Sequence, residues 1–124
     1  MIIPTLTNSH LSLCPLQLRD AVILHSIYQQ ESVLKYFPNP TPPPLERLDH
    51  FILAQQTHWQ KYGYGNWDIL PDGEQEIIGW AGLQYLPELD ETELGFLLAR
   101  PFWGKGLATK AARLSVQFGF ENCQ

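Results

Sequence analysis

The chain has 124 residues, which suits one domain spanning 1–124. It is 44% hydrophobic, which is too apolar for a disordered segment. The formal net charge of −5 argues against nucleic-acid binding, because such modules usually carry a basic patch. The first residues lack a signal-peptide pattern, and no apolar run approaches the roughly 20 residues of a membrane span. We therefore expect a cytoplasmic protein that does not bind membranes.

The first half of the chain predicts a strand followed by two helices. Residues 8–14 alternate in polarity, which is typical of a short strand. Apolar residues then recur at helical spacing over 16–30 and again over 45–62. The proline-rich residues 36–44 form a stiff connector between the two helices, and Gly63 ends the second.

The second half predicts three strands and a final helix. The strands are expected at 66–70, 76–86 and 93–99, and the helix at 105–120. The sequence Pro-Asp-Gly at 71–73 predicts a tight turn. The continuous apolar run in the last strand indicates burial on both faces.

This order of elements predicts an α/β (α+β) domain. Hairpins join the middle strands, so the sheet should be mixed and mostly antiparallel, with helices covering its faces.

Cysteines and histidines indicate no metal site. Cys14 and Cys123 stand in no CxxC or Cys/His spacing, and the chain has no HExxH motif. A disulfide between them is conceivable, but two reduced thiols in a reducing compartment fit the composition better. The four histidines are interpreted as structural or surface residues: His10, His25, His50 and His58.

The segment from Trp103 to Thr109 is the most informative part of the sequence. Gly104 and Gly106 flank Lys105 directly before the final helix. Glycine lets another group approach the backbone, and the first N–H groups of a helix have no intrahelical partner. Together they form an anion site that suits a pyrophosphate, with Lys105 adding positive charge. A glycine pair before a helix can equally be a tight turn, and neither GxxxxGK[ST] nor GxGxxG is present.

A longer stretch carries a family resemblance. The sequence ELGFLLARPFWGKGLATKAARLSVQFGFE, from Glu93 to Glu121, resembles the acetyl-coenzyme A signature of the GNAT N-acetyltransferase superfamily. It is most similar to the branch of ribosomal-protein N-terminal (alanine) acetyltransferases. The segments 8–30, 36–38 and 77–83 also resemble that branch. The resemblance implies an acyl-CoA N-acyltransferase fold. It also implies acetyl transfer from acetyl-CoA to a primary amine of a protein N-terminus or a small molecule.

The resemblance also implies which residues bind the cosubstrate. The backbone of Phe96, Leu97 and Leu98 would pair with the pantetheine arm, and the amides of Gly104 to Thr109 would hold the pyrophosphate. Lys110 or Arg113 would meet the remaining phosphates or form a solvated helix face. Pro101 departs from the family pattern, because proline donates no N–H. The predicted binding residues are Phe96, Leu97, Leu98, Trp103, Gly104, Lys105, Gly106, Leu107, Ala108 and Thr109.

Glu93 is the predicted general base, acting directly or through water. Direct transfer to an amine requires removal of a proton, and Glu93 opens the strand that resembles the cosubstrate-binding strand. It can also be an ordinary surface glutamate, and Asp68 is a weaker candidate. The acidic run of Glu88, Asp90, Glu91 and Glu93 either attracts a cationic amine or forms a solvated turn.

The family fold normally continues beyond the helix at 105–120 with another strand, a helix and a final strand pair. We therefore expect a C-terminally truncated domain whose strand 93–99 is an open edge. Open apolar edges promote pairing, so we expect a homodimer. The acceptor pocket should include the connector 36–44, Trp80 and Tyr85. The alternative function is a non-catalytic relative that binds coenzyme A or only self-associates.

Overall fold

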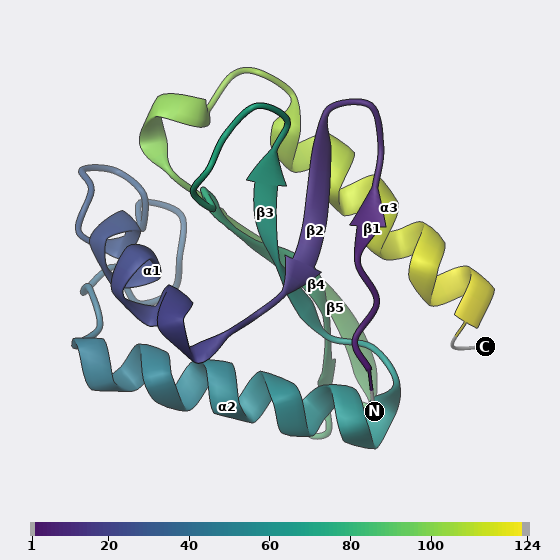
Figure 1. Ribbon diagram of the computed structural model, residues 1–124. Helices are drawn as coiled ribbons and strands as arrows, with labels where there is room; N and C mark the ends of the chain where they lie inside the picture. The colour runs from purple at the N-terminus through teal and green to yellow at the C-terminus, as the bar shows by residue number, and fades with distance from the viewer. Residues whose placement is uncertain (1, 123–124) are drawn as a thin grey trace.

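The computed structural model describes residues 2–122, which form one sheet with helices on both faces (Figure 1). Short 3-10 turns, η1 and η2, precede two of the helices. In chain order the elements are β1 (Leu6–Thr7), β2 (Leu11–Pro15), η1 (Leu18–Asp20), α1 (Ala21–Tyr28), α2 (Leu45–Tyr62), β3 (Asn66–Pro71), β4 (Gly79–Leu86), β5 (Glu91–Leu98), η2 (Arg100–Phe102) and α3 (Leu107–Asn122).

The sheet has five strands in the order β1-β2-β3-β4-β5. Every neighbouring pair is antiparallel, with Cys14 opposite Asp68, Asp68 opposite Trp80, and Trp80 opposite Leu97. The expectation of a mostly antiparallel sheet flanked by helices is confirmed. The expected parallel component is not found within residues 2–122. As expected, β5 lies at an edge of the sheet.

The two faces of the sheet are covered by different helices. Trp80 of β4 donates its indole N–H to the Tyr28 hydroxyl of α1 at 3.0 Å and packs against Phe51 of α2. Leu83 points to the opposite face, where a side chain at Gly119 of α3 would meet it. Hence α1 and α2 cover one face and α3 the other, as Figure 1 shows.

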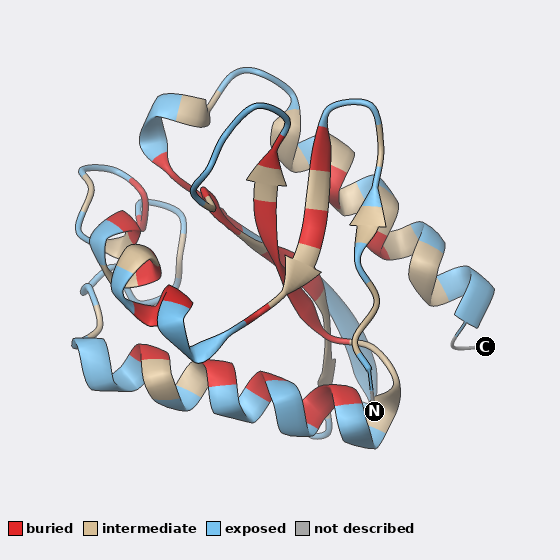
Figure 2. Cartoon of the chain, viewed as in Figure 1, coloured by how far each residue is buried: buried red, intermediate tan, exposed pale blue. Residues whose placement is uncertain are grey.

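The core lies along the central strands and the inner sides of the helices (Figure 2). Leu13, Ile69 and Ile52 are completely buried. Trp59 and Trp67 pack edge-to-face with ring centroids 4.8 Å apart. Such aromatic packing fixes how α2 crosses the end of the sheet.

The N-terminal region differs from its predicted layout. A short strand, β1, precedes β2 because the Asn8 carboxamide accepts the N–H groups of His10 and Leu11 and closes a turn. The predicted helix over 16–30 is divided into η1 and α1. Asp20 explains this division, because its carboxylate accepts the Gln17 N–H at 2.9 Å and caps the 3-10 turn.

The prediction that the strand at 93–99 is buried on both faces is wrong. Residues 91–94 are exposed, and Leu94 and Phe96 keep 41% and 48% of their surface accessible. Only the end of β5, at Leu97 and Leu98, is buried. The reason is its edge position: within residues 2–122 no strand pairs with its outer side.

Two sequence expectations concern compartment and redox state. No helix in residues 2–122 is long and apolar enough to cross a bilayer. Cys14 is a half-buried free thiol. Cys123, the other cysteine of the disulfide that was considered, lies outside the described residues.

Candidate functional site

The loop between β5 and α3 presents a row of free backbone N–H groups. Gly104 and Gly106 have φ of +79° and +75°, a conformation that favours glycine. The helix starts at Leu107, two residues later than predicted, and the Lys110 N–H bonds to the Gly106 carbonyl at 3.1 Å. Within residues 2–122, the N–H groups from Gly104 to Thr109 have no hydrogen-bond acceptor. A Cβ at Gly104 would meet no atom within 4 Å, so the space before these donors is open.

Trp103 fixes the loop to the end of β5. Its indole N–H donates to the Leu98 carbonyl at 2.7 Å, and the Arg100 guanidinium lies 4.5 Å from its ring centroid. The Arg100 N–H donates in turn to the Gln30 carboxamide at 2.8 Å. Since the indole N–H is already paired, Trp103 can offer a ligand its ring surface while holding the glycines in place.

The register of β5 decides which of its backbone groups are available. The Ala99 N–H bonds to the Ile78 carbonyl at 2.7 Å. In an antiparallel pair the bonding positions alternate, so the backbone of Leu97 faces Trp80 of β4. The backbones of Leu94 and Phe96 point outward, as does that of Leu98, whose carbonyl is paired with Trp103. Of the three residues predicted to pair with pantetheine, Phe96 has both N–H and C=O free at the edge.

A cavity of about 500 Å³ lies beside this edge, and we call it the edge cavity. None of its lining side chains carries a charge at neutral pH. Its floor is β5, one wall comes from the connector after α1, and the other comes from the glycine loop and α3. The lining residues are Val33, Tyr36, Phe37, Leu94, Gly95, Phe96, Leu97, Leu98, Trp103, Gly104 and Ala108.

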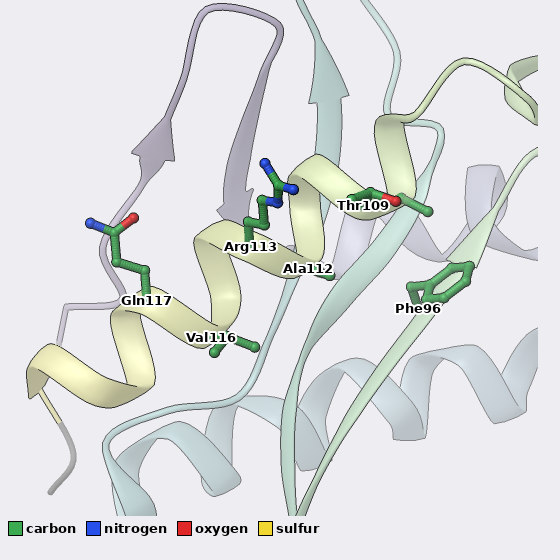
Figure 3. Close-up of a pocket in the computed structure, with 7 residues that line it drawn as sticks. Phe96, Thr109, Ala112, Arg113, Val116 and Gln117 are labelled. Carbon is green, nitrogen blue, oxygen red and sulfur yellow. The ribbon is translucent and has the colours of Figure 1, made fainter.

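A second hollow of about 510 Å³, the α3 groove, continues from the edge cavity. It lies between Phe96 of β5 and the side of α3 formed by Ala112 and Val116 (Figure 3). Phe96 and Ala108 line both spaces, so the two hollows meet there. Arg113 and Gln117 also line this groove, and Figure 3 shows the Arg113 side chain directed away from Phe96.

The structure thus brings most of the predicted binding residues together. Phe96, Leu97, Leu98, Trp103, Gly104 and Ala108 line the edge cavity, and Thr109 lines the α3 groove. Lys105, Gly106 and Leu107 line neither; the Lys105 ammonium rests 5.5 Å from the Phe102 ring. The Lys110 ammonium lies within 3.3 Å of the position of a Cβ on Gly106, beside the free amides.

Other candidates lie outside these cavities. Glu93 is exposed, opposite Gln84, on the face of the sheet opposite to the Phe96 side chain. Trp80 and Tyr85 were expected to line the acceptor pocket, but neither lines the edge cavity. Trp80 is hydrogen-bonded to Tyr28 on the face that α1 and α2 cover. Tyr85 donates its hydroxyl to Asp90 at 2.6 Å, and this bond raises the pKa of Tyr85 to about 12.

His58 has a structural role, as its sequence context indicates. Its Nδ1 lies 2.7 Å from the Tyr64 carbonyl, and its Nε2 accepts the Tyr85 N–H at 3.0 Å. This pattern requires a neutral ring with the proton on Nδ1. Burial lowers the pKa of His58, which keeps the ring neutral.

Part of the site gave no recognisable signal in the sequence. Val33, Ala112 and Val116 gave no signal, because apolar residues on or near helices are usually core. Asp68, considered for proton transfer, is buried in another cavity beside Asp20. An acidic residue in the middle of a buried strand was the signal that could have marked it.

Comparison with known proteins gives the family. The profile of the acetyltransferase (GNAT) domain matches residues 10–124. An uncharacterized N-acetyltransferase p20 of Bacillus licheniformis is 29% identical over 118 residues, which covers 94% of this chain and 66% of that protein. An FsC-acetyl coenzyme A-N(2)-transacetylase of Aspergillus fumigatus is 36% identical over 67 residues, or 48% of this chain and 28% of that protein. This chain therefore spans less than two thirds of the length of these relatives.

Solved structures have the same fold. The acetyltransferase from Agrobacterium tumefaciens superposes with a TM-score of 0.82 at 27% identity, covering 98% of this chain and 69% of its own. RimL, a ribosomal L7/L12 alpha-N-protein acetyltransferase in complex with coenzyme A, superposes with a TM-score of 0.73 at 16% identity. That match covers 96% of this chain and 70% of RimL. This chain belongs to the GNAT acetyltransferase domain family.

Proposed function

We propose that this chain binds acetyl-coenzyme A along β5 and at the glycine loop, and serves an N-acetyltransferase that acts on primary amines. The observation that carries the proposal is the row of free N–H groups from Gly104 to Thr109 beside open space. Such donors at a helix N-terminus suit a pyrophosphate, and the nearby Lys110 ammonium suits a further phosphate. The uncharged edge cavity suits the pantetheine arm.

The outward backbone of β5 supports a strand-like binding mode for that arm. Phe96 offers one N–H and one C=O in the plane of the sheet, and the arm contains amides that complement them. Leu94 offers a second pair further along the edge. An N–H from this edge is also the donor proposed to stabilise negative charge on the thioester carbonyl oxygen.

The proposed chemistry is direct transfer. The acceptor nitrogen attacks the thioester carbonyl carbon, the new C–N bond forms, and the C–S bond breaks. The nitrogen gives up one proton, and the departing thiolate takes one from solvent or a nearby donor. Glu93 lies three residues from Phe96, roughly 10 Å along an extended strand and on the opposite face, so we propose that it acts as base only through a chain of waters.

The acceptor class is a primary amine of a protein N-terminus or of a small molecule. The exposed carboxylates Glu88, Asp90, Glu91 and Glu93 lie at the end of the β4–β5 hairpin. Within residues 2–122 none of the four is in an ion pair. They would raise the local concentration of a cationic amine. The reduced Cys14 thiol fits the proposed cytoplasmic location.

The open edge of β5 favours a second proposal, self-association into a dimer in which a second copy occupies the edge in place of the pantetheine arm. Leu94 and Phe96 expose apolar surface beside unpaired strand backbone, which is a template for pairing with another copy. A lysine at Leu94 should prevent this pairing while keeping the fold. Sedimentation of the wild type and Leu94→Lys tests it: a wild type that stays monomeric at about 100 µM contradicts the proposal.

Calorimetry with acetyl-coenzyme A, followed by a thiol-release assay with a panel of amines, tests the main proposal. Binding with turnover is the expected result. Binding without turnover for any amine favours the non-catalytic alternative for this chain. No binding would refute the assignment of the glycine loop.

A further inference from the structure

A separate cavity of about 430 Å³ lies on the α1 side of the sheet, and we call it the carboxyl cavity. It shares no lining residue with the edge cavity or the α3 groove. Strands β2 and β3, the turn η1 and the turn between β3 and β4 enclose it. Its polar lining residues are Cys14, Gln17, Arg19, Asp20, Asp68, Gln75 and Glu76.

Two carboxyl groups meet in its wall. Asp68 comes from the central strand β3 and is 1% exposed, and Asp20 comes from η1 and is 9% exposed. One oxygen of Asp20 accepts the Gln17 N–H at 2.9 Å, which holds this side chain in place. The pKa of Asp68 is raised to about 10, mainly by burial and further by the hydrogen bond and the charge of Asp20. Asp68 therefore keeps its proton at neutral pH.

The pair is incompletely satisfied. Within residues 2–122, Oδ1 of Asp68 has no hydrogen-bond partner, although it is fully buried. A buried polar atom without a partner costs about 1–3 kcal/mol, so such atoms are rare in native proteins. Arg19 lines the same cavity yet forms no ion pair or hydrogen bond with either carboxyl.

The groups around Asp20 and Asp68 indicate which kind of ligand would satisfy the two carboxyls. The exposed residue Glu76 adds negative charge at the rim. The Cys14 thiol stays neutral, because burial, and to a lesser extent Asp68 and Asp20, raises its pKa. A positively charged hydrogen-bond donor would satisfy the pair. No group of three or more His, Cys, Asp or Glu side chains in residues 2–122 is arranged to hold a metal ion. An ammonium group needs no such ligand set, because it brings three donors of its own.

We propose that the carboxyl cavity binds a primary alkylammonium ion, with its nitrogen between Asp20 and Asp68 and its carbon chain against Ile23, Leu70 and Ile77. The Asp68 proton leaves to solvent when the cation enters, and the ammonium then donates to both carboxylates. The other charged or titratable groups facing the pair are Cys14, Arg19 and Glu76. Because one proton is released, binding tightens as the pH rises. This site is independent of the proposed cosubstrate site.

Calorimetric titration with n-butylammonium chloride, using 1-butanol as the neutral analogue, tests the site. The ammonium should bind more tightly at pH 8 than at pH 6, and 1-butanol should not bind. Asp68→Asn keeps the size and can still donate to Asp20, and it should weaken ammonium binding by about tenfold or more. Arg19→Gln removes a competing cation and should strengthen it. Asp72→Asn, at an exposed turn residue, is the matched control and should change nothing.

A readout in the wild-type chain covers the case in which Asp68→Asn does not fold. The carboxyl carbon-13 resonance of Asp68 should move to its ionised position as n-butylammonium is added. An unmoved resonance would overturn the proposal, as would equal binding of 1-butanol or unchanged ammonium binding in folded Asp68→Asn.

Discussion

Replacement of Asp68 by Asn should stabilise the fold increasingly as the pH rises. Asp68 is completely buried on β3, and its pKa is raised from 3.8 to about 10 by burial and by Asp20. Between these values the unfolded chain releases the proton while the folded chain keeps it. The unfolded state then binds fewer protons, so the stability of the wild type falls with rising pH. Asn carries no such proton, and its amide can donate to the Asp20 carboxylate.

The magnitude follows from the proton count. One proton held by the folded state alone changes the free energy of unfolding by about 1.4 kcal/mol per pH unit. From pH 5 to pH 8 the upper limit is therefore about 4 kcal/mol. The advantage of Asp68→Asn over the wild type should grow toward that limit across this range. Below about pH 3 the pH-dependent part of the advantage should vanish, because Asp68 is then protonated in both states.

Urea denaturation followed by tryptophan fluorescence at pH 5, 6, 7 and 8 measures this effect. Trp59 and Trp67 are buried and report directly on the core. Asp72→Asn serves as the control, since Asp72 is exposed and its replacement should shift all curves equally. A stability difference between Asp68→Asn and the wild type that stays constant from pH 5 to pH 8 would refute the reasoning.

The remaining predictions concern the proposed cosubstrate site. Gly104→Val places a β-branched residue at φ +79° in front of the free amides. Calorimetry should show that this variant binds acetyl-coenzyme A about 100-fold or more weakly, whereas Glu93→Gln should change the affinity little. Equal losses would count against the loop. Glu93→Gln should lower turnover by about 100-fold with binding retained, and an unchanged pH–rate profile would exclude it as base. Trp103→Phe removes the hydrogen bond to the Leu98 carbonyl. It should lower the free energy of unfolding in urea by about 1–2 kcal/mol and weaken acetyl-coenzyme A binding. If stability and affinity are both unaltered, the indole does not anchor the loop.

Much of the fold could be predicted because local signals were strong. Prolines before Leu45 and glycine after Tyr62 fixed α2 at both ends, and the Pro-Asp-Gly turn placed the β3–β4 hairpin. The glycine pair likewise placed the loop, since positive φ is required at both positions.

What could not be predicted depends on distant partners. The sequence of β5 reads as a buried strand, yet its exposure is decided by its place at the sheet edge. The meeting of Asp20 with Asp68 depends on how η1 packs against β3. The role of Trp103 depends on a bond to the Leu98 carbonyl that no spacing rule indicates. The pairing register of β4 and β5 likewise decides that the backbone N–H and C=O of Phe96 are free while those of Leu97 bond to β4.

Amide NMR during a titration with coenzyme A tests the central claim most directly. We predict that the N–H resonances of Gly104, Gly106 and Leu107 move downfield as their free hydrogens bond the pyrophosphate, and that the resonance of Phe96 moves with them. If coenzyme A binds and these resonances stay in place while others shift, the glycine loop does not hold the pyrophosphate, and the proposed site is contradicted.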